Sequence, residues 1–378
     1  MKLLHISDLH IGKTIYEQSL IEDQRYILNT IIEIIKENNI DGLLVSGDVY
    51  DRGVPSTEAV DLLNDFLNEL VLNLKKKVFI ISGNHDSKER LGFSNKILEN
   101  QGLYIQTTYE GYIKNITFEK EKIRVYLLPF VKPAEIQKYF DEEIKTYDDA
   151  IKRIIEKEEL DKEYKNIILT HQFIIPSNGE IERSESETSY LGGIENVKAE
   201  YFKDFDYAGL GHIHKPQVVI NDKVRYSGSI LKYSFSESHD TKIGVILDIN
   251  EKINISTVPL TPKRDMREIK GKLNTLISDE VSSLENKEDY LKVILTDEEP
   301  LFNVIDILRK TYPNVLCVEF FKDKGNQNEL NYANIDELKK LDVKQLFSDF
   351  YKEQNNVYMS EKCEKVIEEI INNVKEEN

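Results

Sequence analysis

Residues 77–86 read KVFIISGNHD, an apolar run that passes directly into the polar cluster Gly83-Asn84-His85-Asp86. Residues 42–51, GLLVSGDVYD, repeat this arrangement, with Gly47-Asp48 after the apolar run. Short runs rich in branched apolar residues are typical of buried strands. In α/β sheets, ligands bind outside the carboxyl ends of the strands. The two stretches therefore predict an α/β fold with a functional site at one edge of a sheet.

The same transition from apolar run to polar cluster recurs elsewhere, at Asp8-Leu9-His10, Thr170-His171 and Gly211-His212-Ile213-His214. Carboxylates and imidazoles suit Mn, Fe or Zn, and the absence of cysteine from these clusters argues against a structural zinc site. On an extended backbone alternate residues point the same way, so Asp8 and His10 can bind one ion. His212 and His214 share this spacing, although their rings can also serve two neighbouring ions.

Two further residue types complete this pattern. Asp48 carries two carboxylate oxygens and can bridge two ions, and Asn84 offers a neutral oxygen ligand. Glycines at 47, 83 and 211 are expected to let the backbone turn tightly where each strand ends. We therefore expect strand ends that are remote in sequence to build one metal-binding pocket.

The first 260 residues read as strands separated by helices. Further candidate strands are Lys2–Ser7, Arg124–Pro129, Asn166–Thr170, Asp206–Leu210, Val224–Ser227, Ile243–Ile249 and Ile253–Pro259. Helical spacing of apolar residues occurs in Glu17–Asn38 and Thr57–Leu74, and Pro133–Tyr164 is a charged helical stretch expected on the outside. The broad apolar stripe of Thr57–Leu74 fits either a helix that also packs against a second chain or a core helix of one subunit.

A boundary is expected near Leu260, where prolines and the charged run Lys263–Arg267 follow. Strand, helix and strand are then expected at Tyr290–Leu295, Leu301–Thr311 and Val315–Phe321. The tail is charged and helical, and its amphipathic segment Glu361–Glu376 either docks on its own domain or binds a partner. The expected domains are residues 1–260, 261–330 and 331–378.

Composition narrows the class of protein. The 378 residues carry 50 Lys and Arg against 68 Asp and Glu, and this net charge of −18 excludes a generic basic nucleic-acid coat protein. A local basic groove, or a site where metals supply positive charge, remains compatible with it. Cys317 and Cys363 form no disulfide framework, polar residues come too early for a signal peptide, and no apolar run is long enough to span a membrane. These features predict a cytoplasmic protein.

In chain order, the motifs DLH, GDVYD, GNHD, TH and GHIH resemble those of the calcineurin-type metallophosphoesterase superfamily. The resemblance implies a β-sandwich flanked by helices (αββα), here with a small α/β capping domain and a helical C-terminal tail. More narrowly, the chain is similar to the SbcD family of bacterial nuclease subunits. That similarity rests on residues 47–51 followed by Val54-Pro55-Ser56, on residues 206–217 (DYAGLGHIHKPQ) and on residues 226–229 (YSGS).

By this resemblance, one metal ion would be held by Asp8, His10, Asp48 and His214. The second would be held by Asp48, Asn84, His171 and His212. His85 would be the catalytic histidine beside the phosphate, with Asp86 as its supporting partner. Archaeal and eukaryotic relatives carry a second histidine at position 51, so Asp51 is expected to be an accessory residue only.

The resemblance further implies hydrolysis of DNA phosphodiester bonds with two divalent ions, Mn²⁺ being the expected metal. The implied activities are an ATP-dependent exonuclease on double-stranded ends and an endonuclease on single strands and hairpins, in DNA repair, recombination and replication. The alternatives are a small-substrate phosphoesterase acting on cyclic nucleotides or general phosphodiesters, and an inactive scaffold.

The implied partner is an SbcC-type ABC ATPase with a coiled coil, since this chain has no GxxxxGK[ST] phosphate loop of its own. The Glu361–Glu376 helix would dock on that coiled coil, and Thr57–Leu74 would form a homodimer within a two-plus-two complex in the nucleoid. The loop Pro176–Val197 and the residues Lys263, Arg264 and Arg267 are candidate DNA contacts, although a mobile surface loop and solvated charge explain them equally simply.

Overall fold

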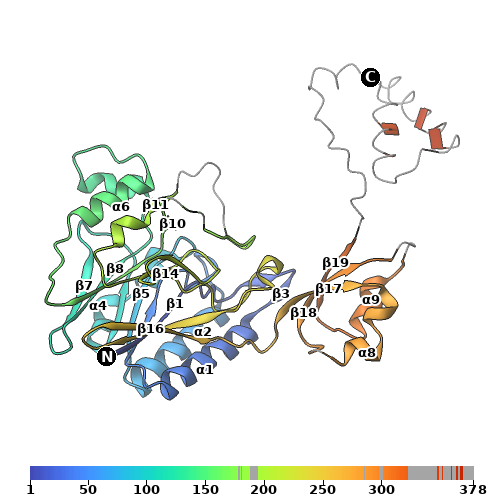
Figure 1. Cartoon of the computed structure of the whole chain (residues 1–378), viewed down its shortest axis with the longest axis horizontal. Coiled ribbons are helices and arrows are strands. Elements are labelled where there is room, and N and C mark those ends of the chain that lie inside the picture. The colour runs from blue at the N-terminus through green and yellow to red at the C-terminus, as the bar shows by residue number, and fades with distance from the viewer. Residues whose placement is uncertain are drawn as a thin grey trace. The chain divides into compact units, whose positions relative to one another are not determined.

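Two six-stranded sheets form the frame of the chain in the computed structural model (Figure 1). The structure describes residues 1–177, 179, 181–187, 195–284, 286–297 and 301–321, and beyond these only residues 347, 348, 351, 359, 363, 364, 367 and 368. The chain divides into two compact units, Met1–Phe321 and Lys322–Asn378. Among the described residues, all helices and strands with defined bounds lie in the first unit.

The first sheet is mainly parallel. Its strands, in spatial order, are β16 (Ile253–Pro259), β15 (Ile243–Ile249), β1 (Lys2–Ile6), β4 (Gly42–Val45), β5 (Lys77–Ile81) and β6 (Leu103–Gln106). The strands from β1 to β6 run parallel, whereas β15 is antiparallel to β1 and β16 to β15. The carboxyl ends of β1, β4 and β5 therefore lie at one edge of this sheet.

The second sheet repeats this plan. Its order is β13 (Gln217–Ile220), β14 (Val224–Tyr226), β12 (Tyr207–Leu210), β9 (Lys165–Thr170), β8 (Ile123–Leu128) and β7 (Lys114–Phe118). β14, β12, β9 and β8 are parallel, and the two outer strands are antiparallel to their neighbours. The loops after β9 and β12 carry the remaining predicted metal ligands.

The two sheets pack face to face, and helices cover their outer faces (Figure 1). The apolar cluster between the sheets takes Leu3 and Phe79 from the first sheet and Ile167 and Tyr207 from the second. In β1, Leu4 faces the other way and packs with the helices. Because both faces of these strands are buried, their sequences read as continuous apolar runs. The expected αββα fold class is confirmed.

The helices differ in length from the expected segments. On the first sheet lie α1 (Ile21–Glu37) and α2 (Thr57–Asn68), and α2 continues as a π-helical turn (Glu69–Asn73). The stretch expected at Pro133–Tyr164 is broken into α5 (Pro133–Ile136) and α6 (Tyr147–Glu156), the latter capped by Thr146. The remaining short helices before residue 260 are α3 (Lys88–Leu91) and α4 (Asn95–Leu98). Within the described residues, no helix has the length and apolar character needed to cross a bilayer.

The region after Pro262 is a small three-stranded parallel sheet with helices. Its elements are β17 (Met266–Gly271), α7 (Leu273–Leu276), α8 (Asp279–Ser282), β18 (Tyr290–Leu295), α9 (Val304–Arg309) and β19 (Val315–Phe320). The strand–helix–strand prediction is confirmed, but β17 begins within the run that was expected to be a linker. Most of the Glu361–Glu376 segment lies outside the described residues. The domain boundaries stay predictions.

Candidate metal centre

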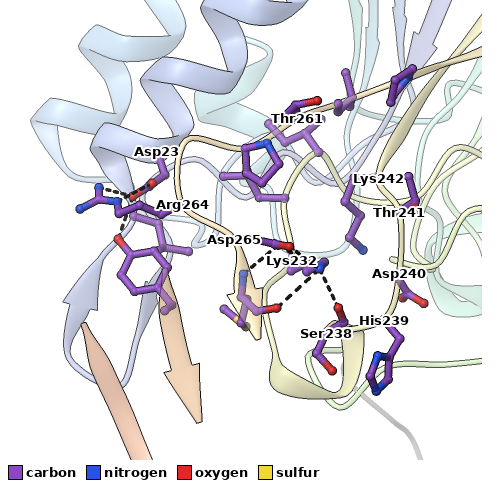
Figure 2. Close-up of a pocket in the computed structure, with 18 residues that line it drawn as sticks. Asp23, Lys232, Ser238, His239, Asp240, Thr241, Lys242, Thr261, Arg264 and Asp265 are labelled. Carbon is purple, nitrogen blue, oxygen red and sulfur yellow. Dashed lines mark hydrogen bonds and ion pairs between the residues drawn. The ribbon is translucent and has the colours of Figure 1, made fainter. Parts of the chain in front are cut away.

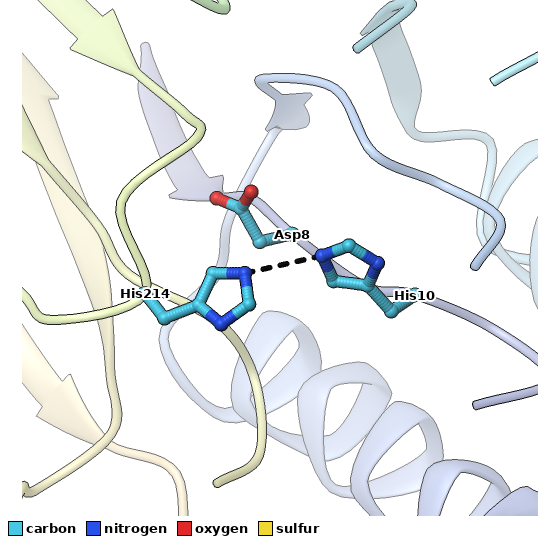
Figure 3. Close-up of side chains that lie close together, drawn as sticks. All are labelled: Asp8, His10 and His214. Carbon is cyan, nitrogen blue, oxygen red and sulfur yellow. Dashed lines mark hydrogen bonds between the residues drawn. The ribbon is translucent and has the colours of Figure 1, made fainter. Parts of the chain in front are cut away.

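Side chains from both sheets converge at the edge where the parallel strands end. Asp8 and His10 follow β1 and meet His214, which follows β12, and Figure 3 shows the rings of His10 and His214 facing each other beside Asp8. A second group, which shares Asp8, adds Asp48 and His171. Within each group the ligand atoms lie within 4.8 Å of one another. The structure thus brings together residues that are far apart in the sequence.

The backbone at this edge is strained. Asp8, His10 and Asp48 adopt positive φ angles of 52°, 43° and 48°, and His212 has a φ of 95°. Positive φ is uncommon outside glycine and costs on the order of 1–3 kcal/mol per residue. Such conformations persist where function requires a side chain in a fixed place. Their concentration at four predicted ligands marks this edge as functional.

The predicted role of the glycines is only partly right. Gly47 has a φ of +89°, which agrees with a tight turn. Gly83 and Gly211 lack positive φ; a Cβ there would lie 2.1 Å from the Asp48 carboxylate and 1.9 Å from the Ser46 carbonyl, respectively. These two glycines are needed because backbone segments approach closely, not because the chain must turn.

Asp48 occupies the centre of the cluster. One carboxylate oxygen lies 3.6 Å from His10 Nε2 and 3.3 Å from His171 Nε2. The other accepts a hydrogen bond from the His85 amide at 2.9 Å. Burial would raise the pKa of this carboxyl, but the neighbouring histidines, above all His171, hold it well below its usual range. Asp48 is therefore an anion placed between two groups of histidines, as a bridging ligand must be.

His171 is oriented for metal binding. Its Nδ1 lies 2.6 Å from the Ser46 carbonyl and must donate there, because a carbonyl only accepts. Its Nε2 then faces acceptors, the Asp48 carboxylate and the Asn84 Oδ1 at 3.1 Å. Although burial lowers the pKa of His171, Asp48 outweighs that effect and raises it to about 9. In the metal-free protein a proton on Nε2 therefore takes the place of a cation.

His212 joins the same side of the cluster, with Nδ1 at 3.1 Å from Asn84 Oδ1. Burial, reinforced by the charge on His171, lowers the pKa of His212 to about 3, so its ring is neutral. The His212 amide donates to both oxygens of Asp8, at 3.0 and 3.1 Å. This contact joins the second sheet to the first at the ligands themselves.

The positions of the His10 and His214 rings indicate whether a cation fits beside their Nε2 atoms. Their Nε2 atoms lie 3.1 Å apart, and burial lowers the pKa of both rings, that of His214 to about 4. The Asp51 carboxylate, 3.5 Å from His10 Nδ1, favours a proton on that nitrogen, and Ser186 Oγ lies 2.7 Å from His214 Nδ1. Two Nε2 lone pairs then face each other, and a cation bound by both removes their repulsion. The residues present fit a divalent metal.

Asp8 adds the second carboxylate. Burial raises the pKa of Asp8 to about 7, and the nearby Asp48 charge contributes to the rise, partly opposed by His171. Ser7 Oγ donates to Asp8 at 2.6 Å. Two buried carboxylates so close together repel unless a cation or a proton lies between them, which again favours a metal site.

Exposure defines the open side of the cluster. Asp8, His10, Asp48, His171 and His214 are buried, whereas Asn84, His85 and His212 are half-buried. His85 stands at this mouth with its Nδ1 at 3.0 Å from the Asp51 carbonyl and its ring edge-on to His10. A substrate that enters from solvent meets these half-buried side chains first.

Asp51 and Asp86 act on neighbours in the structure. The Asp51 carboxylate lies 2.9 Å from Lys13 Nζ as well as beside His10, and its carbonyl accepts from His85. Asp86 accepts backbone hydrogen bonds from Gly83, Val49 and Tyr50, so it joins the loops after β4 and β5. Burial and the Asp48 charge raise the pKa of Asp86 to about 6.

Two polar residues that support the ligand-bearing segments were missed by sequence reasoning. Gln24 in α1 donates to the His10 carbonyl at 2.7 Å and accepts from the Gly12 amide. His5, buried between the sheets, hydrogen-bonds Tyr207 and Ser46 at 2.9 Å each. A polar residue inside an apolar strand was the available signal for His5. For Gln24 no local signal existed.

A separate hollow of about 360 Å³ lies between the segment 230–242 and the residues that enter the small sheet (Figure 2). Its charged side chains are paired: Arg264 with Asp23, and Lys232 with Asp265. Arg267 likewise pairs with Asp289. Arg264 and Arg267 are therefore engaged within the protein, which weakens their candidacy as DNA contacts.

The loop Pro176–Val197 is described only in part. Its described residues Ser186 and Glu187 contact His214, the latter through the His214 amide at 2.8 Å. Arg183 stacks on the ring of Phe173, whose ring in turn lies beside His212. The described part of the loop therefore borders the predicted metal ligands.

Comparison with known proteins adds family information. The family model "Calcineurin-like phosphoesterase" matches residues 1–216, and the model "Type 5 capsule protein repressor C-terminal domain" matches residues 262–355. The SbcD subunit of the SbcCD nuclease from Staphylococcus epidermidis is 34% identical over 366 residues, which are 96% of this chain and 95% of that protein.

Solved structures give weaker likenesses. A phosphoesterase from E. coli is 14% identical with a TM-score of 0.30, and it aligns with 69% of this chain and 100% of its own. A dimetal phosphatase from Danio rerio is 12% identical with a TM-score of 0.39, over 69% of this chain and 99% of its own. Likenesses at these scores support no conclusion about this site.

Proposed function

The chain belongs to the calcineurin-like phosphoesterases and, among them, to the SbcD nuclease subunits, and on this premise we propose that its histidine–carboxylate cluster binds two divalent ions and hydrolyses DNA phosphodiester bonds. The observation that carries the proposal is the arrangement around Asp48, an anion between two sets of imidazoles at the end of both sheets. The family match over almost the whole chain supports DNA, rather than a small phosphoester, as the substrate.

We assign one ion to Asp8, His10, Asp48 and His214, and the other to Asp48, Asn84, His171 and His212. Mn²⁺ is the metal we expect, since carboxylate, amide and imidazole ligands without thiolate suit it. When bound, the two ions supply positive charge for the phosphate and a water that ionises near neutral pH.

His85 is the proposed acid–base residue. It stands at the open side of the cluster, and its amide is held by Asp48. Because Nδ1 is engaged by the Asp51 carbonyl, proton exchange with the leaving sugar oxygen falls to Nε2. Asp51 acts through the two histidines it contacts and does not touch the substrate. Proton transfer by such a group contributes about 10²–10⁴-fold to the rate.

The charge of the chain bears on how it holds DNA. The 68 Asp and Glu outnumber the 50 Lys and Arg, so the chain as a whole repels DNA, whereas each neutralised phosphate needs a well-placed Lys or Arg. We therefore propose that an SbcC-type ATPase with a coiled coil holds the DNA and supplies ATP dependence, and that the tail near Glu361–Glu376 docks on it. Exonuclease action on double-stranded ends and endonuclease action on single strands and hairpins follow from the family resemblance.

Assembly and location are proposed on related grounds. In α2 and the turn after it, Val60 and Leu72 are 43% and 47% exposed, although Leu63 and Phe66 are buried. This apolar residue pair supports a homodimer within a two-plus-two complex. A chromosomal DNA substrate places the protein in the cytoplasm at the nucleoid, in DNA repair, recombination and replication.

The test is a paired nuclease assay on linear duplex and hairpin DNA with Mn²⁺. Wild-type protein and His85→Ala are compared, each with and without the ATPase partner and ATP. We expect cleavage by the wild type, and loss of cleavage by His85→Ala with unchanged Mn²⁺ binding in calorimetry. Wild-type protein that hydrolyses a cyclic nucleotide but not DNA would establish the small-substrate alternative instead. Normal cutting by His85→Ala would remove its assigned role.

A further inference from the structure

The ring of His214 is held on the side away from the metal cluster by a buried polar network. Its Nδ1 lies 2.7 Å from Ser186 Oγ, and Ser186 Oγ lies 2.6 Å from the carboxylate oxygen Oε1 of Glu237. Glu237 is completely buried, in a short 3₁₀ turn (Phe235–Glu237) that follows the second sheet. Glu237 Oε1 itself is 3.7 Å from His214 Nδ1, so Ser186 provides the shorter connection.

Lys242 neutralises this carboxylate. Lys242 Nζ donates to Glu237 Oε2 at 2.6 Å and to the His214 carbonyl at 2.8 Å, and the two charged side chains are 3% and 0% exposed. A buried ion pair rarely adds stability over apolar side chains of similar size. Its position behind His214, with one contact to the ring through Ser186 and one to the backbone, suggests that it serves the site.

The hydrogen bonds determine which nitrogen of His214 carries the proton. The Lys242 ammonium donates to the Glu237 carboxylate at 2.6 Å, so this carboxylate is the charged partner of an ion pair and only accepts hydrogen bonds. Ser186 has one hydroxyl proton and donates it to Glu237. Its oxygen must then accept from His214, which puts the proton on Nδ1. The lone pair is left on Nε2, the nitrogen 3.1 Å from His10 Nε2.

We propose that Glu237, neutralised by Lys242 and acting through the Ser186 hydroxyl, is a positioning residue that fixes the His214 ring in the tautomer and orientation needed to bind metal. This inference rests on the proposed metal site and names the group that prepares one of its ligands. It also gives the loop Pro176–Val197 a role at the site, since Ser186 belongs to it. His171 needs no such relay, because its Nδ1 donates directly to a backbone carbonyl.

The first test measures metal affinity. Full-length wild type, Ser186→Ala, Ser186→Thr and Glu237→Gln are titrated with Mn²⁺ in a calorimeter. Loss of an outer partner of a metal-bound histidine typically weakens affinity about 10–100-fold, and we expect Ser186→Ala and Glu237→Gln in that range. Ser186→Thr keeps the hydroxyl and should restore most of the affinity. The matched control is Ser184→Ala, which removes a neighbouring hydroxyl that bonds Ser186 and Glu187 but not His214.

The second test needs no metal. In ¹⁵N-histidine NMR spectra of the metal-free protein, wild-type His214 should give the signature of a ring protonated at Nδ1. Ser186→Ala should shift that resonance toward a mixture of tautomers, while the His171 resonance stays unchanged. A residue that merely stabilises the fold would move neither the tautomer nor the affinity of a folded variant.

The outcomes separate the two proposals. If the wild type binds no Mn²⁺, the proposed function fails, and the NMR signature alone then decides the tautomer. If the wild type binds Mn²⁺ and folded Ser186→Ala matches it in both affinity and ring signature, the positioning role of Glu237 is wrong. If Glu237→Gln does not fold, Ser186→Ala decides, because Ser186 is half-buried in a loop and its truncation leaves the ion pair intact.

Discussion

The two sheets contribute to the site in different ways. The first supplies Asp8, Asp48 and Asn84, the proposed oxygen ligands, together with His10, and three of these four residues have positive φ. The second supplies only imidazoles, and its contacts reach back into the first: His171 donates to the Ser46 carbonyl, and the His212 amide donates to Asp8. Both carboxylates of the proposed set thus come from the first sheet, and the second sheet contributes histidines to it.

This difference shows how the site depends on the fold. The carboxylates of the first sheet attract a cation by themselves, and residues with strained backbone hold them close together in spite of their repulsion. The imidazoles of the second sheet would reach a cation only where the sheets are docked closely, at Gly47 and Gly211. Metal binding and sheet docking should therefore depend on each other. The first sheet should contribute most of the electrostatic attraction for the metal.

The largest expected effect is from Asp48→Asn. Asp48 lies beside histidines of both ions, so its loss should remove both ions and abolish cleavage, a drop well beyond the roughly 10–100-fold that outer partners contribute. His212→Ala should remove one ion and leave the other. Metal content per chain, measured by elemental analysis together with nuclease rate, distinguishes the two. Equal losses in both variants would contradict the unequal roles of the sheets.

The next effect is on sheet docking. In Gly211→Ala the new Cβ would lie 1.9 Å from the Ser46 carbonyl and 2.6 Å from His171 Nδ1, both parts of a rigid core. Overpacking of this kind costs about 1–3 kcal/mol or more, and we expect the free energy of unfolding in urea to fall by at least the upper figure. The control is Gly53→Ala, whose Cβ would meet nothing closer than 3.8 Å. A stable Gly211→Ala protein with intact metal binding would show that the sheets can separate freely.

A smaller effect is expected at Gln24 in α1, which hydrogen-bonds the loop after β1. Gln24→Leu removes hydrogen bonds to the His10 carbonyl and the Gly12 amide. The carbonyl keeps its bond from the Lys13 amide, so the Gly12 amide is the group that loses its partner. An unsatisfied buried group costs about 1–3 kcal/mol, so stability should fall by that amount and Mn²⁺ affinity with it. Asn38→Ala, which removes a bond at the far end of α1, is the matched control. Unchanged Mn²⁺ affinity would mean that the loop after β1 holds its strained shape unaided.

Much of this arrangement could be predicted from the sequence. The apolar runs before Asp48, His85 and His171 identified the strands, because strands buried on both faces carry no other pattern. The grouping of polar residues at one edge followed from the parallel order of such strands. The fold class is confirmed on that basis, and the predicted ligands lie together.

The rest depends on tertiary contacts that have no local signature. Positive φ at Asp8 or His212 arises from the docking of loops, and non-glycine residues give no warning of it. Glu237 and Ser186 lie far apart in sequence and meet only behind His214. The strand β17 was missed because its exposed face is charged and its first residues belong to the run Lys263–Arg267, which was interpreted as a boundary. Contacts of the Glu361–Glu376 segment stay predictions.

The smallest expected effect is the release of protons when metal binds, one from a carboxyl of the first sheet and one from a histidine of the second. Metal binding must displace the protons of Asp8, with a pKa of about 7, and of His171, with a pKa of about 9. At pH 6 both are protonated and at pH 8 mainly His171 is, so Mn²⁺ binding should release about two protons at pH 6 and about one at pH 8. Metal affinity should therefore rise with pH between 6 and 9. Calorimetry in buffers of different ionisation enthalpy measures the released protons.

The proton on His171 also affects the stability of the metal-free protein. Because the pKa of His171 is raised above its unfolded value of 6.5, its stabilising contribution is complete below pH 6.5 and is lost as the pH rises through about 9.

For the proton-release experiment, Asp8→Asn is the matched variant, since it removes the titrating group of the first sheet and leaves His171. It should lower the release at pH 6 toward about one proton for whatever metal still binds, and leave the release at pH 8 nearly unchanged. Equal release by the wild type at both pH values would show that the carboxylate of the first sheet is already ionised, and the charge difference between the sheets would then be larger than the structure indicates.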